Sequence, residues 1–185
     1  MFKFLRKTNP HESTAQTLYA SAVKQARLPL FYEQFGVADT PDGRFDMIMV
    51  HVYLILRHLK GGDTQCQAVA QMVFDTMFTD MDQNLREMGA GDIGVAIRIK
   101  DMAKAFYGRI GAYDEGLDSA ESETLEGALL RNVYRKTVPE DEQVKAMASY
   151  IKTQSEALAM QAYDELMQGI LTFDPPQTLE GNSHG

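Results

Sequence analysis

The sequence predicts an all-α protein: a single compact domain of six to seven helices, with a basic N-terminal segment and a disordered C-terminal tail. Apolar residues recur with the spacing of an α-helix through most of the chain. No stretch of useful length alternates between apolar and polar residues as a strand does. With 185 residues, of which 44% are hydrophobic, the chain is long enough for one domain with a normal core.

Seven segments carry the helical spacing. In order, they are residues 13–27, 29–37, 45–60, 65–88, 93–113, a run from within 114–126 to Tyr134, and 139–169. Pro29 ends the first helix, and the short aromatic second segment is expected to be a brief one. The third segment is apolar on nearly all sides, which is typical of a helix at the centre of a fold. The fifth carries its apolar stripe at Ile93, Ala96, Ile97, Met102, Phe106, Ile110 and Tyr113.

Turn and capping residues set the boundaries between these helices. Pro41 and Gly43 predict a bend before the central helix, over residues 38–45. Asp63 or Thr64 can cap the helix that follows it. The run Thr137-Val-Pro-Glu predicts a capping box, with a proline in the first turn of the last long helix.

The stretch DMDQNLREMGAGD, residues 80–92, joins two predicted helices. Gly89 can adopt the left-handed conformation that ends a helix, and Asp92 can begin the next one. A helix joint therefore explains the glycines. It does not explain the adjacent charges of Arg86 and Glu87, which can be solvated, paired with neighbours or buried in a network.

Composition excludes several classes of protein. A net charge of −8 and a pI near 5.0 exclude a typical nucleic-acid binder, which needs a basic face. The single cysteine, Cys66, allows neither an internal disulfide nor a cysteine-based zinc site. No apolar run approaches the roughly 18 residues that span a bilayer. The apolar part of the N-terminal MFKFLRK is too short for a secretory signal, so we expect a cytoplasmic-type protein. Nucleophile, zinc-protease and phosphate-loop motifs are missing from the sequence.

The N-terminal segment MFKFLRK has two interpretations. It is either a frayed terminus or a weak, reversible membrane-surface contact. The residues that would make this contact are Phe2, Lys3, Phe4, Leu5, Arg6 and Lys7. We therefore divide the chain into a basic and aromatic tail (1–12), a helical domain (13–171) and a flexible tail (172–185).

Two histidines and the many methionines leave alternatives open. His51 and His58 lie seven residues apart on one helix, about 10 Å by helix rise, which is too far to share a metal ion. We expect His51 to be buried and bonded to a neighbour. The alternative is a haem- or small-molecule-binding protein that uses His51 or His58 with Tyr107.

The methionines either fill the core or line an adaptable groove. They are Met47, Met49, Met72, Met77, Met81, Met88, Met102, Met147 and Met160.

Three segments together resemble the ubiquinol–cytochrome c chaperone family, over residues 15 to 170. They are LYASAVKQARLPLFYEQFGVADTPDGRFDMIMVHVYLILRHL (18–59), DMDQNLREMGAGD (80–92) and KDMAKAFYGRIGAYDEGL (100–117). The resemblance implies a helical, non-enzymatic assembly factor for ubiquinol–cytochrome c reductase, with no cofactor. Mitochondrial members act on newly made cytochrome b at the inner membrane, with a small partner subunit and a ribosome contact.

The resemblance also implies a location and a set of site residues. The chain lacks an Arg- and Ser-rich transit peptide, so we expect a bacterial relative that is cytoplasmic and peripherally associated with the inner membrane. Its partners would be cytochrome b or another reductase subunit and a small partner protein, and no nucleic acid. The positions that match the family motifs are Asp39, Gly43, Arg44, His51, Arg86, Glu87, Gly89, Asp92, Tyr107, Gly108 and Arg109.

Most of these positions also have a structural interpretation. Gly43, Gly89 and Gly108 permit turns or close approach of two backbones. The arginines at positions 44, 86 and 109 are expected to pair with Asp39, Glu87 and Asp92 and so hold the helix joints. If the same residues are exposed, they form a recognition surface. A purely structural interaction module without membrane contact is a third hypothesis.

Overall fold

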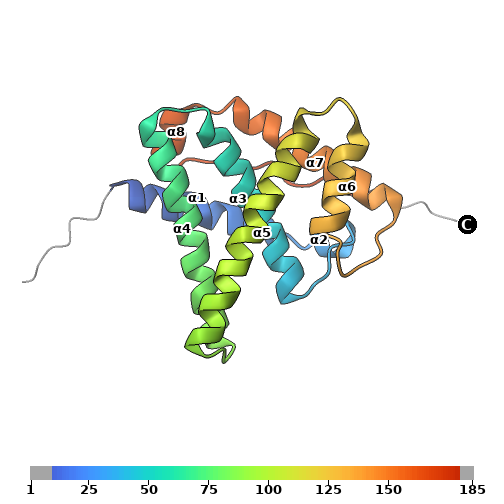
Figure 1. Ribbon diagram of the computed structural model, residues 1–185. Helices are drawn as coiled ribbons and strands as arrows, with labels where there is room; N and C mark the ends of the chain where they lie inside the picture. Colours follow the sequence, from blue (N-terminus) through green and yellow to red (C-terminus); the bar gives the residue numbers. More distant parts are fainter. Residues whose placement is uncertain (1–9, 180–185) are drawn as a thin grey trace, which may run out of the picture.

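The computed structural model describes residues 10–179, and in that part of the chain all regular structure is α-helical (Figure 1). The predicted membrane-contact residues 2–7 lie outside the described residues. The helices are α1 Pro10–Ala26, α2 Leu30–Glu33, α3 Pro41–Lys60, α4 Thr64–Glu87, α5 Asp92–Asp118, α6 Ser122–Asn132, α7 Asp141–Ala159 and α8 Tyr163–Met167. The all-α prediction is confirmed, with six longer helices and the two short ones, α2 and α8.

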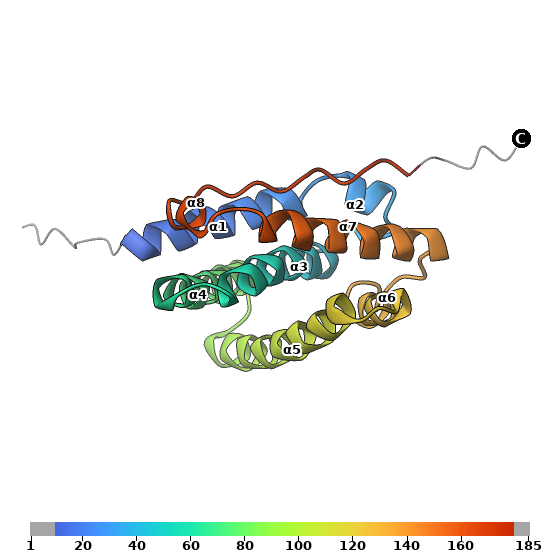
Figure 2. The same ribbon diagram turned by 90° about the horizontal axis from the view of Figure 1, so that it is seen from above.

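Helix α3 lies at the centre of the fold, as its apolar sequence predicted. It contacts α1, α4, α5 and α7, and most of its length from Asp46 to Ile55 is buried. Seen from above, α1 and α2 lie on one side of α3, and α5 and α6 lie on the other (Figure 2). This three-layer arrangement buries the middle of α3 on nearly every side, in keeping with the absence of Asp, Glu, Lys and Arg from residues 47–56. Among the described residues, none of the helices combines the length and the apolar character needed to span a membrane.

The start of α3 corrects one prediction. The bend expected over residues 38–45 is instead the first turn of the helix, which begins at Pro41. Thr40 is the N-cap, and its hydroxyl accepts a hydrogen bond from the Gly43 N–H at 3.2 Å. Proline suits the first helical position because the N–H that it lacks has no partner there. A Cβ on Gly43 would clash with the carbonyl of Ala38, so this glycine serves close approach rather than a bend.

The ends of α4 and α7 show where local sequence signals were sufficient and where they were not. Asp63 caps α4 as predicted, since its carboxylate accepts from the N–H groups of Gln65 and Cys66 at 2.9 and 3.0 Å. The capping box of α7 is formed by Glu140 and Gln143, so the box predicted to begin at Thr137 is wrong. The expected helix over 139–169 is also wrong beyond Ala159. There the chain turns and re-forms as α8, and the apolar spacing gave no sign of this break.

Residues 170–179 contain no helix and run along α1 and α7; we call this segment the strap (Figure 2). The predicted flexible tail begins at residue 172, yet residues 172–179 pack against the core. Phe173 and Leu179 are partly buried there, and Pro176 is buried. The ordered chain therefore extends beyond the predicted boundary, because the apolar residues of the strap complete the cover over α1 and α7.

Candidate functional site

Helices α4 and α5 form a hairpin whose tip projects beyond the rest of the described chain (Figure 1). Its tip is the joint between Glu87 and Asp92. Gly89 ends α4 with a φ of 88°, as predicted. The Gly89 N–H donates to the Arg86 carbonyl at 2.9 Å, and the Ala90 N–H donates to the Leu85 carbonyl at 3.1 Å. This is the Schellman pattern, in which glycine takes the left-handed position that other residues avoid.

The charges next to this joint face solvent. Arg86 pairs with Asp82 at 2.5 Å and also with Asp92 on the other side of the joint. Asp92 is one of the three acids expected to pair with the motif arginines, whereas Glu87, another of them, does not pair with Arg86. Glu87 instead accepts a hydrogen bond from the amide of Gln83 at 3.0 Å. Arg86 thus ties the two helices together at the surface, outside the core.

Beyond the joint, α5 exposes a ridge of apolar residues. Ile93, Ile97 and Tyr107 have 79%, 57% and 59% of their surface exposed. Their spacing of four and ten residues places them on one side of the helix, opposite the buried Phe106 and Tyr113. We call this surface the α5 outer face; it consists of Ile93, Ile97, Lys100, Lys104, Tyr107, Gly108 and Gly111.

The prediction of the apolar stripe of α5 was therefore only partly right. Phe106 and Tyr113 lie in the core, and Met102 and Ile110 pack against it. Ile93 and Ile97 were grouped with them, but the first turns of α5 extend past the core and leave these two side chains in solvent. Exposed apolar side chains that gather on one helix face mark an interaction site more often than scattered ones do.

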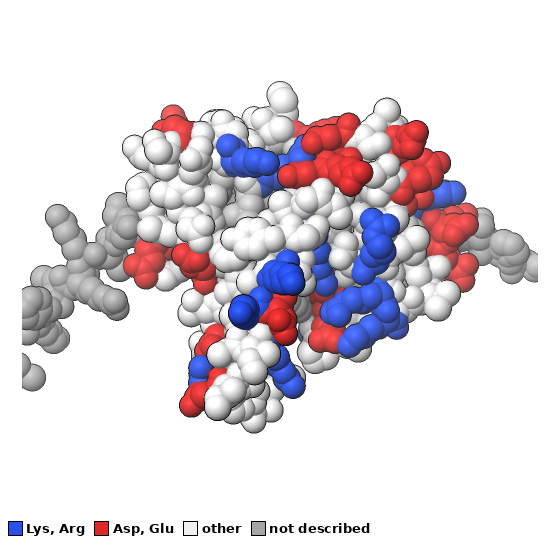
Figure 3. Space-filling view, in the orientation of Figure 1, with Lys and Arg blue, Asp and Glu red and all other residues white. Residues whose placement is uncertain are grey.

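The charge around the α5 outer face is uneven. Lys100 and Lys104 lie between the apolar residues, and both side chains are exposed, as is that of Asp101 at the edge of this face. Figure 3 shows basic side chains in the middle of this face, whereas acidic ones gather towards the end where α5 meets α6. The chain is acidic as a whole, so this local basic character sets the face apart.

Tyr107 and the two glycines of the α5 outer face have different settings. The ring of Tyr107 packs beside that of Phe74 on α4, with centroids 5.4 Å apart, while much of it stays in solvent. A Cβ on Gly108 or Gly111 would meet no atom within 4 Å. The predicted close approach at Gly108 is therefore not made within the described chain, and the helix backbone there is open to a partner.

The motif residue Arg109 points the other way, into the core. It donates to Asp46 of α3 at 2.7 Å, and Arg135 approaches the same carboxylate at 3.2 Å. Asp39 and Arg44 form the expected exposed pair at 2.7 Å. The partner expected for Arg109 was therefore wrong. The signal missed was Asp46 itself, since an acid within a buried helix requires a counter-charge.

His51 is fully buried and bonded on both ring nitrogens, as the sequence led us to expect. Its Nδ1 donates to the Met47 carbonyl at 2.8 Å, so Nε2 accepts from the Tyr150 hydroxyl at 2.9 Å. Burial lowers the pKa of His51 to about 4, which keeps the ring neutral at physiological pH. A haem bound to His51 would have to break one of these two bonds.

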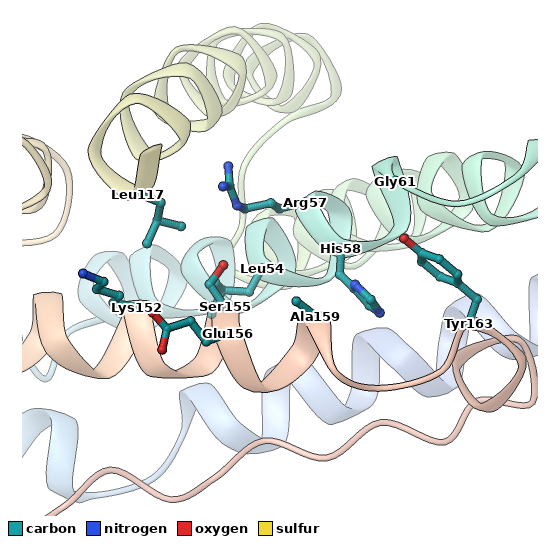
Figure 4. Close-up of a pocket in the computed structure, with 10 residues that line it drawn as sticks. All are labelled: Leu54, Arg57, His58, Gly61, Leu117, Lys152, Ser155, Glu156, Ala159 and Tyr163. Carbon is teal, nitrogen blue, oxygen red and sulfur yellow. The ribbon is translucent and has the colours of Figure 1, made fainter. Parts of the chain in front are cut away.

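His58 lines a pocket of about 350 Å³ between α3, α7 and the end of α5 (Figure 4). Its ring stacks on Tyr163 with centroids 4.9 Å apart, and its Nε2 bonds the Gln161 carbonyl at 3.1 Å. Arg57 in the same pocket is neutralised by Asp114 and by Asp118, at 2.5 and 2.6 Å. An anionic ligand in this pocket would therefore have to compete with these two acids for the guanidinium of Arg57.

The methionines mostly fill the core, which confirms the simpler of the two interpretations. Buried or partly buried are Met47, Met49, Met72, Met77, Met81, Met102 and Met147. Met88 and Met160 are exposed, but they follow α4 and α7 respectively and do not share a groove. Among residues 10–179, His, Cys, Asp and Glu side chains do not gather into a group of three that could hold a metal ion.

Comparison with known proteins places this fold in a family. The family model described as Ubiquinol-cytochrome C chaperone matches residues 33–173. Ubiquinol-cytochrome-c reductase complex assembly factor 1 of Xenopus laevis is 24% identical over 162 residues, which cover 87% of this chain and 80% of that protein. The human protein of that name is also 24% identical over 162 residues, but the match spans 54% of its length. The chain thus spans about half of the human relative.

A solved structure agrees with these sequence matches. The crystal structure of the Cbp3 homolog from Brucella abortus has a TM-score of 0.81 and 35% sequence identity to this chain. The match covers 92% of this chain and 94% of that one. The chain therefore belongs to the ubiquinol-cytochrome C chaperone family.

Proposed function

We propose that this protein is a non-enzymatic chaperone that holds newly made cytochrome b while ubiquinol–cytochrome c reductase is assembled. The observation that carries the proposal is the α5 outer face, an exposed apolar ridge in a chain of this family. The relatives are named for assembly of the reductase complex, and cytochrome b is our choice among its subunits.

The chemistry of the α5 outer face suits an apolar helical client. Ile93 and Ile97 offer aliphatic surface, and Tyr107 offers an aromatic ring next to it. Gly108 and Gly111 let the backbone of a client helix approach closely, as small residues do between helices in membranes. A membrane subunit that is not yet fully assembled has such helices and lacks their final neighbours.

The basic residues support a position beside the membrane. Lys100 and Lys104 point outward among the apolar side chains, where anionic lipid headgroups would attract them by about 1 kcal/mol each. Residues 2–7 would add a second weak contact of the same kind. We therefore propose a cytoplasmic protein that associates peripherally with the inner membrane, in which the domain of residues 13–171 carries the client site.

Deleting the gene from its host and restoring it tests this function. The deletion strain should lose most of its assembled reductase, seen as lost ubiquinol–cytochrome c reductase activity and lost cytochrome b absorbance. The restored chain should sediment with membranes and leave them in high salt, because charge contacts are screened. Another respiratory complex in the same membranes is the control. Normal reductase levels in the deletion strain would contradict the proposal.

A further inference from the structure

The strap is seated by side chains that bind its backbone. The Gln161 amide bonds both the N–H and the carbonyl of Thr172, at 3.2 and 2.7 Å. Asp174 is held through its N–H by Gln154 at 2.9 Å and through its carbonyl by Gln25 at 2.6 Å.

A fourth glutamine continues this pattern at the far end of the strap. The side chain of Gln34 accepts from the Leu179 N–H at 2.9 Å. In the described part of the chain, the hydrogen bonds between residues 171–179 and the helices or their ends all run through such glutamine side chains. A carboxamide offers a donor and an acceptor to any extended backbone, whatever its side chains.

From Phe173 to Leu179, the side chains of the strap that face the protein follow a period of three. Phe173 and Leu179 are partly buried and Pro176 is buried, whereas Asp174 and Pro175 between them are exposed. Three residues per turn is the repeat of a polyproline II helix, so these three anchors share one side of the strap. The two adjacent prolines favour that conformation before the strap docks.

The first anchor meets the buried histidine of the central helix. The ring of Phe173 lies edge-on to His51 with centroids 5.2 Å apart. His51 bonds the Tyr150 hydroxyl, which also accepts from the Gln25 amide at 3.0 Å, and Gln25 donates to the strap. One hydrogen-bonded chain therefore joins α3 to the backbone of the strap, and it orients the amide that recognises this backbone.

We propose that the groove along α1 and α7 is a binding site for an extended, proline-containing peptide of another protein. Its ligand would carry an aromatic residue, a proline three residues later and an aliphatic residue three residues after that. The strap occupies the groove in cis and restricts access to it. Aromatic-lined grooves that bind polyproline II segments are a recurring mode of peptide recognition.

The fold allows the strap to leave without loss of a helix. The strap follows Gly169, whose φ of 79° belongs to the turn after α8, and residues 170–179 belong to no helix. The strap and the α5 outer face lie on opposite sides of α3 (Figure 2). A peptide in the groove and a client on α5 can therefore be bound together, and the proposal does not depend on the proposed function.

The absence of tryptophan from the sequence gives a direct test with the full chain. In the Phe173→Trp variant, a docked strap should give blue-shifted tryptophan emission. Adding the synthetic peptide ILTFDPPQTL should move this emission to the red in a saturable way. The tethered strap competes at an effective concentration on the order of mM, so the midpoint should lie near that range. A control peptide with alanine for the phenylalanine and both prolines should bind at least roughly tenfold more weakly, an energy difference of about 1.4 kcal/mol.

The variant Gln154→Ala, made together with Phe173→Trp, tests the role of the glutamines. It should shift the emission to the red before any peptide is added, because a buried amide that holds the strap is lost. Three results would overturn the proposal: emission that stays blue up to the solubility limit of the peptide while circular dichroism shows a folded chain, equal binding of the control peptide, or no effect of Gln154→Ala.

Discussion

Replacing Asp46 with alanine should lower the free energy of unfolding by about 3–5 kcal/mol, because it leaves the charge of Arg109 buried without a partner. The Asp46 side chain is 2% exposed and that of Arg109 is 8% exposed. Burial raises the pKa of Asp46 although Arg109 and Arg135 act in the opposite direction. The charged form of Asp46 therefore depends on its two arginines. Removing this carboxylate takes the neutralising charge away from both guanidinium groups. Urea unfolding of the variant measures the loss.

A double-mutant cycle separates this pair from simple loss of packing. Asp46→Ala combined with Arg109→Met should cost less than the sum of the two single changes, because neither charge then stays buried alone. Asp39→Ala is the matched control, since it breaks the exposed pair with Arg44 and should change stability much less. Additive costs in the cycle, or equal losses for Asp39→Ala and Asp46→Ala, would contradict the account.

Lowering the pH from 6.5 to 4 should reduce the free energy of unfolding by about 3 kcal/mol through His51 alone. The reason is that burial lowers the pKa of His51 to about 4 in the folded chain. In this window the unfolded chain binds a proton at this imidazole and the folded chain does not. Protonation therefore favours the unfolded state, and the contribution of His51 is fully present only above the unfolded pKa near 6.5. The physical cause is burial of a ring whose two nitrogens are already bonded.

Free energies of unfolding at pH 7, 6 and 5 test this effect, because most carboxylates stay ionised over that range. The variant His51→Gln should show a shallower slope than wild type, whatever its absolute stability. His58→Gln is the control, since burial lowers the pKa of the half-buried His58 too but by a smaller amount. A slope that His51→Gln leaves unchanged would refute the assignment.

The features that the sequence predicted correctly depend on neighbours in the chain. The apolar character of residues 45–60 predicted a central helix, and Gly89 and Asp63 predicted a helix end and a cap. Each of these depends on residues within a few positions of one another. The pair of Asp39 with Arg44, five residues apart, was found for the same reason.

The features that were missed depend on contacts between distant segments. Asp46 and Arg109 are 63 positions apart, and the glutamine at position 34 meets Leu179 across 145 positions. Nothing in the local pattern pairs these residues. The apolar stripe also continues in register past Ala159, where the chain turns to place α8 and the strap against α1. Periodicity reports which residues are apolar and leaves open where the chain changes direction.

The candidate site shows the same limit. The motif residues drew attention to the joint at Arg86 and Gly89, which the structure explains as a surface tie and a helix end. The adjacent Ile93 and Ile97 share the predicted apolar stripe with core residues, and spacing alone cannot show that the first turns of α5 extend beyond the core. The apolar ridge that carries the proposed function became visible only with the packing of α4 against α5.

Capture of cytochrome b from membranes tests the central claim most directly. Tagged wild-type chain should recover cytochrome b, and Ile97→Asp should recover at least roughly tenfold less, because a charge would enter the apolar contact. Val138→Asp is the matched control, since Val138 is 99% exposed and lies outside the α5 outer face, and it should capture as wild type does. Equal capture by Ile97→Asp and wild type, with both chains folded, would show that the client does not bind the α5 outer face.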